Sequence, residues 1–90
     1  MTMNSVAIGD LERRRLRWRA RRGLLENYII VSRFLDAHEH ELDVDDVLAL
    51  EALLDLPDNE LLDLLMARAE PRAPLATPPI LDLLRRLRAA

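Results

Sequence analysis

The chain has 90 residues, no cysteine and a net charge of −3 at neutral pH, a length that fits one domain. The lack of cysteine excludes disulfides and thiolate metal sites, and no run of about 18 uncharged apolar residues occurs, so we expect no membrane insertion. Leucine, alanine, arginine and glutamate dominate while glycine is scarce, which favours helices, and no secretory signal is found near the start, which favours a cytoplasmic protein.

The first predicted helix starts at Asp10, which we expect to be its N-cap, and residues 1–9 are predicted to be a flexible terminus. Leu11 and Trp18 lie seven residues apart and so share a helix face, through which this helix should pack. Arginines occupy most of its other positions.

Two residues predict where the next helices begin. Gly23 marks the boundary before the second helix, and Asp43 is typical of the N-cap of the third. The second helix is predicted over residues 24–41, and its apolar stripe has helical spacing. Members of that stripe are Leu24, Tyr28, Val31 and Leu35. In the third helix, Val47, Leu50 and Leu54 share one face.

The fourth helix is predicted to open near Asp58 and to have a core face made of leucines and one methionine. These residues are Leu61, Leu62, Leu65 and Met66. Prolines then predict an irregular connector over residues 71–76, and Thr77 followed by Pro78 is a typical helix start. The fold class is therefore all-α: a single compact bundle of about five short helices over residues 10–90.

Arginine and acidic residues are segregated along the chain. Residues 11–22 contain seven arginines and one acid, whereas residues 36–70 contain twelve acids and one arginine. The arginine-rich helix could contact RNA or pair with the chain's own acidic half. Overall acidity and the few aromatic residues favour internal pairing, and we expect no nucleic-acid partner.

Residues that could carry catalysis or bind metal are few. His38 and His40 are two apart, so they lie on different sides of a helix, and a surface position is the simpler interpretation. Neither Ser5 nor Ser32 lies in a nucleophile motif, and glycine is too sparse for a phosphate loop. We therefore expect no metal site and no enzymatic activity.

The sharpest local pattern is the segment Arg22-Gly23-Leu24-Leu25-Glu26. On a helix, Arg22 and Glu26 would lie four apart and project together, with bare backbone at Gly23 between them. Such a patch suits the docking of a protein. From spacing alone, an ordinary helix junction with one surface ion pair is the simpler interpretation.

The same residues, preceded by Arg21, match the Arg-Gly-x-x-Glu hallmark of a family. The segments 16–20 and 50–61 also resemble that family's aromatic-bearing first helix and its leucine-rich stretch between the third and fourth helices. The chain thus resembles the bacterial FAD-assembly factors of succinate dehydrogenase over about residues 11–70. Tyr28 is a departure, since many relatives carry an acidic residue there.

This resemblance implies a five-helix monomer that binds the flavoprotein subunit of succinate dehydrogenase, with that of fumarate reductase as a second candidate. It implies that Arg22, Gly23 and Glu26, with Arg21 beside them, contact the partner near its flavin. Binding would promote covalent attachment of FAD to the partner, while the factor itself holds no cofactor stably. Alternatives are an antitoxin-like regulatory module and weak RNA binding through the first helix.

Overall fold

The computed structural model describes residues 9–90, in which the regular elements are helical. They are α1 (Asp10–Ala20), α2 (Leu25–His38), a 3₁₀ turn (Glu39–Glu41), α3 (Val44–Leu54), α4 (Asp58–Leu65) and α5 (Pro78–Ala89). The predicted all-α bundle of five short helices is confirmed. Apart from Gly9, the terminus predicted to be flexible lies outside the described residues.

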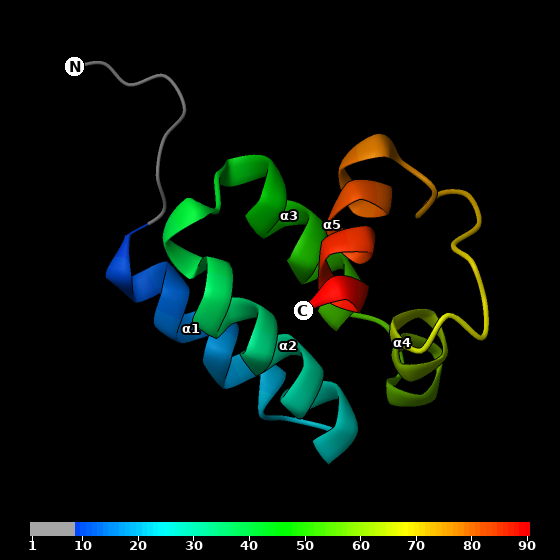
Figure 1. Cartoon of the computed structure of the whole chain (residues 1–90), viewed down its shortest axis with the longest axis horizontal. Coiled ribbons are helices and arrows are strands. Elements are labelled where there is room, and N and C mark those ends of the chain that lie inside the picture. The colour runs from blue at the N-terminus through cyan, green and yellow to red at the C-terminus, as the bar shows by residue number, and fades with distance from the viewer. Residues whose placement is uncertain (1–8) are drawn as a thin grey trace.

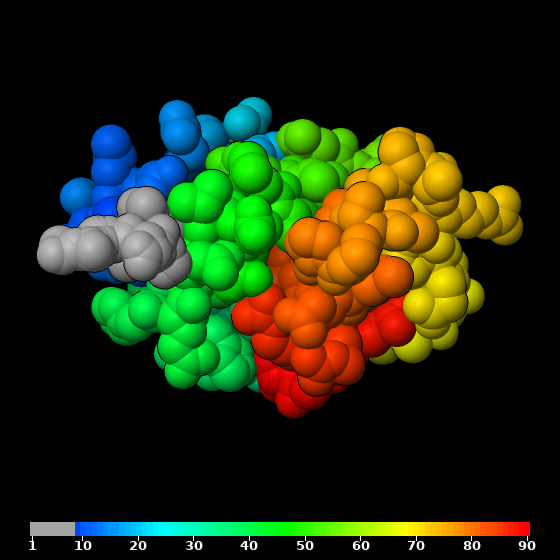
Figure 2. All heavy atoms as spheres, turned by 90° about the horizontal axis from the view of Figure 1, so that it is seen from above, coloured from blue at the N-terminus to red at the C-terminus, as the bar shows by residue number. Residues whose placement is uncertain are grey.

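Helix α2 occupies the middle of the bundle and contacts α1, α4 and α5 (Figure 1). Helix α5 packs extensively on α3, and the two cover one face of the molecule (Figure 2). The connector between α4 and α5 loops out at one end of the bundle in both views. Within residues 9–90, no helix is both long and apolar enough to span a bilayer.

Local hydrogen bonds explain where three of the helices begin. The Asp43 carboxylate accepts from the Asp46 amide at 2.9 Å, and Asp46 accepts in return from the Asp43 amide. Thr77 Oγ1 accepts from the Ile80 amide, so both predicted caps are confirmed. The cap of α1 was predicted one residue late, because Gly9 holds that position and its amide donates to the Glu12 carboxylate.

The face through which α1 packs differs from the predicted one. Leu11 and Trp18 are 75% and 58% exposed, whereas Leu16 and Ala20 are buried against the core. Leu16 and Ala20 are four residues apart, so they also form a helical stripe. The small side chain of Ala20 lets α1 approach its neighbours, and the larger Trp18 is left on the surface.

A similar correction applies to α4, which ends one residue before the last apolar residue of its predicted core face. Met66 is 50% exposed and Leu62 is only partly buried, while Leu64 joins Leu61 and Leu65 in the core. The helix stops at Leu65 because Ala67 adopts a positive φ of 59°. Residues 66–77 therefore form an irregular connector that is longer than the segment predicted.

Candidate partner-binding site

The motif segment forms a turn between α1 and α2. Arg22 and Gly23 lie outside both helices, and Glu26 lies in the first turn of α2. All three residues are exposed. Arg22 and Glu26 do not share a helix, because Gly23 at φ +110° redirects the chain between them, and the boundary predicted at Gly23 is confirmed.

Gly23 has a positive φ and lies against the side chain of Asp58 in α4. A Cβ atom at this position would lie 2.4 Å from Oδ1 of Asp58, the first residue of α4. Its positive φ is also one that side chains other than glycine rarely adopt. The missing side chain thus makes room for the Asp58 carboxylate, which places the start of α4 beside the turn.

Asn27 adds a second link to α4 and was missed by the sequence analysis. It is 4% exposed, and its Nδ2 donates to the backbone oxygen of Asp58 at 3.1 Å. Its Oδ1 is buried without a hydrogen-bond partner among the described residues. Its spacing could have indicated that it is buried, since Asn27 lies four and seven residues before the buried Val31 and Phe34 and so shares their helix face.

The charged side chains at the turn do not pair with each other. The Arg22 guanidinium lies over the Trp18 ring, 4.8 Å from its centroid, and Arg21 lies 6.0 Å from that of Tyr28. No ion pair joins Arg22 to Glu26, and the Glu26 carboxylate has no ion pair or hydrogen bond within residues 9–90. The carboxylate of Glu26 is therefore available to an external group.

Exposed apolar side chains accompany these charges on α2. Leu25 is 65% exposed, and Ile29, one turn later, also projects from the surface. Leu25 and Ile29 flank Glu26 on α2, and Trp18 lies under Arg22. We define the turn surface as Trp18, Arg22, Leu25, Glu26 and Ile29, a combination of exposed apolar side chains and charges that suits protein docking.

The arginine-rich helix is partly neutralised by the chain itself. Arg17 Nη2 lies 2.5 Å from a Glu39 carboxylate oxygen and 2.9 Å from one of Asp36, and Arg19 pairs with Asp55. The hydrogen bond from Arg17 to Glu39, together with Asp36, raises the pKa of the Arg17 guanidinium. The predicted pairing with the acidic half is confirmed for these arginines.

The histidines lie near the end of α2, away from any metal-ligand set in the described chain. The His38 ring packs against Phe34, with centroids 5.1 Å apart, and its Nδ1 lies 3.0 Å from Glu41. His40 is exposed. Within residues 9–90, no group of three histidine, aspartate or glutamate residues is placed to hold a metal ion.

Comparison with known proteins gives two matches. The family model described as flavinator of succinate dehydrogenase matches residues 14–88. The FAD assembly factor SdhE of Ralstonia nicotianae is 60% identical over 77 residues, which cover 86% of this chain and 81% of that protein. No solved structure gives a significant match. The matched segment contains the whole turn and all five helices except the start of α1 and the last residue of α5, and the chain belongs to the family of succinate dehydrogenase flavinators.

Proposed function

We propose that the chain binds the flavoprotein subunit of succinate dehydrogenase and promotes covalent attachment of FAD to that subunit. The observation that carries the proposal is family membership combined with an exposed turn surface whose Glu26 carboxylate is unpaired within the described residues. Arg22, Gly23 and Glu26 form the partner-binding site, with Arg21 beside them. The flavoprotein subunit of fumarate reductase is a second partner.

The chain acts without catalysing the reaction and without holding FAD stably. It binds one conformation of the flavoprotein more tightly than others and so raises the population of that conformation. There the acceptor histidine of the partner and the flavin methyl group are aligned, which is a gain from proximity and orientation. The factor works as a cytoplasmic monomer, and nucleic acid is not a partner, because acids of the same chain occupy several of its arginines.

The test mixes the apo flavoprotein subunit, FAD and the purified chain, and follows covalent flavin by its fluorescence in a denaturing gel. Glu26→Ala and Arg22→Ala should each lower the rate of flavin attachment by about tenfold, a loss of roughly 1.4 kcal/mol of interaction. Far-UV circular dichroism should remain helical, because both side chains are exposed. Attachment that proceeds equally well without the chain would refute the proposal.

A further inference from the structure

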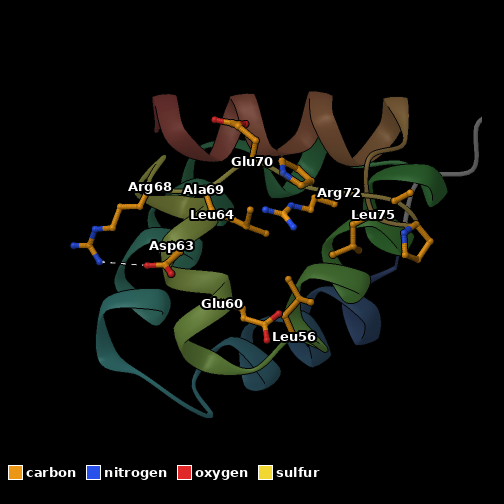
Figure 3. Close-up of a pocket in the computed structure, with 12 residues that line it drawn as sticks. Leu56, Glu60, Asp63, Leu64, Arg68, Ala69, Glu70, Arg72 and Leu75 are labelled. Atoms are coloured by element: carbon orange, nitrogen blue, oxygen red, sulfur yellow. Dashed lines mark ion pairs between the residues drawn. The ribbon is translucent and has the colours of Figure 1, made fainter.

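A groove of about 670 Å³ lies between α4 and the connector 66–77 (Figure 3). Leu56, Leu64 and Leu75 contribute apolar walls. Most of the lining residues are exposed, so the groove is open along the surface. Small-molecule sites of this volume bury most of their ligand. An open groove suits a segment of a protein partner, because such a segment contacts the groove on one side only.

The wall of the groove is held in place by α5. Arg88 Nε donates to the Leu64 carbonyl at 2.9 Å, and its Nη2 donates to the Ala69 carbonyl at 3.1 Å. Its Nη1 also lies 3.3 Å from the Glu70 carboxylate. The end of α4 and the start of the connector are therefore fixed before any partner arrives, which lowers the entropic cost of binding.

Two charges in the groove lack internal partners. Asp63 pairs with Arg68 at 3.6 Å, and Glu70 pairs with Arg88. By contrast, the side chains of Glu60 and Arg72 have no ion pair or hydrogen bond within residues 9–90. Figure 3 shows Glu60 entering from α4 and Arg72 from the connector, on opposite sides of the hollow.

Helix α4 connects this groove to the turn between α1 and α2. Its first residue, Asp58, packs against Gly23 and accepts the hydrogen bond from Asn27. Glu60, two residues later, lines the groove. A partner that covers the turn can therefore extend along α4 into the groove.

We propose that the groove is a second contact surface for the flavoprotein subunit. It takes a segment in which an apolar side chain, packed on the leucines, lies between a basic residue that meets Glu60 and an acidic residue that meets Arg72. The inference rests on the proposed function and adds to it a partner motif of stated chemistry. Because the groove offers one negative and one positive side chain, reversing either charge should weaken binding. An attraction that depended on net charge alone would respond in opposite directions to the two reversals.

The test measures the dissociation constant of the purified chain for the apo flavoprotein subunit. Arg72→Glu and Glu60→Arg should each weaken binding about three- to tenfold, because each replaces an attraction by a repulsion. Two controls make the same changes in net charge away from the groove: Arg85→Glu on α5 and Glu41→Arg in the 3₁₀ turn. Both controls should bind within about twofold of the wild type.

Three results would overturn the inference. The first is unchanged binding by both groove variants while Glu26→Ala still weakens it, which leaves the proposed function intact. The second is an effect of opposite sign for the two reversals, which indicates net-charge attraction. The third is no binding by the wild type, which removes the proposed function as well.

Discussion

Replacing Gly23 by alanine tests whether the turn requires a residue that tolerates a positive φ at this position. A residue other than glycine in a sparsely populated backbone region costs about 1–3 kcal/mol, and Gly23 has φ +110°. The new Cβ would also meet the Asp58 carboxylate at 2.4 Å. Asp58 is exposed and its side chain can rotate away, so the backbone contributes most of the loss.

We therefore expect Gly23→Ala to lower the free energy of unfolding by about 2 kcal/mol. For a chain of this size, that corresponds to a fall of about 8–16 °C in Tm. Urea unfolding followed by circular dichroism measures the first quantity. Adding Asp58→Ala should restore less than half of the loss, because it removes the contact and leaves the strained φ.

Gly9→Ala is a matched control, since a Cβ there meets nothing within 4 Å and φ is −84°. It should cost only about 0.5 kcal/mol, from the poorer N-cap. If Gly23→Ala were no more destabilising than Gly9→Ala, the structural role given to Gly23 would be wrong. Full recovery by Asp58→Ala would instead mean that the contact, and not the backbone, sets the requirement.

Four further variants test other parts of the bundle. Leu16→Ala should lower the free energy of unfolding by about 3 kcal/mol, whereas Leu11→Ala should change it by no more than about 0.5 kcal/mol. Equal losses for the two variants in urea unfolding would contradict the packing face of α1. The hydrogen bond from Arg85 is the largest cause of the lowered pKa of Asp82, and Arg86 lowers it further. This carboxylate therefore stabilises the fold above its ordinary pKa, and the contribution is lost as pH falls. Asp82→Asn should lower the urea midpoint at pH 7 and match the wild type near pH 2. Arg88→Met should cost about 1–2 kcal/mol, because two carbonyl hydrogen bonds are lost, and circular dichroism melting that matches the wild type would contradict that role.

Features that depend on neighbouring residues could be predicted from the sequence. The caps at Asp43 and Thr77 form with amides three residues later, so their chemistry is contained in a short segment. The stripe on α5 was also predictable, because Ile80, Leu84 and Leu87 follow the helical repeat and all are buried. Spacing alone settles such features when no alternative face competes.

Competing faces explain the errors on α1. Leu11 and Trp18 are large and apolar, so hydrophobicity favoured them over the stripe that contains Ala20. The choice was decided by how closely α1 can approach its neighbours, which depends on the surfaces of other helices. In the same way, the sequence predicted that the arginines would pair internally but could not say that Arg17 would meet Glu39, 22 residues away.

The candidate site shows the same limit, because the motif names its residues but does not determine their arrangement. The motif pointed to Arg22, Gly23 and Glu26, but it suggested that the backbone at Gly23 is left open for a partner. In the structure, Asp58, which lies 35 positions later, occupies the space beside Gly23. The side chain of Asn27 also donates a hydrogen bond to the backbone oxygen of Asp58. An isolated pair of α1 and α2 would carry every motif residue without this support. The orientation of Glu26 relative to Arg22 is therefore a property of the folded bundle, and a change in α4 can alter partner binding without touching the motif.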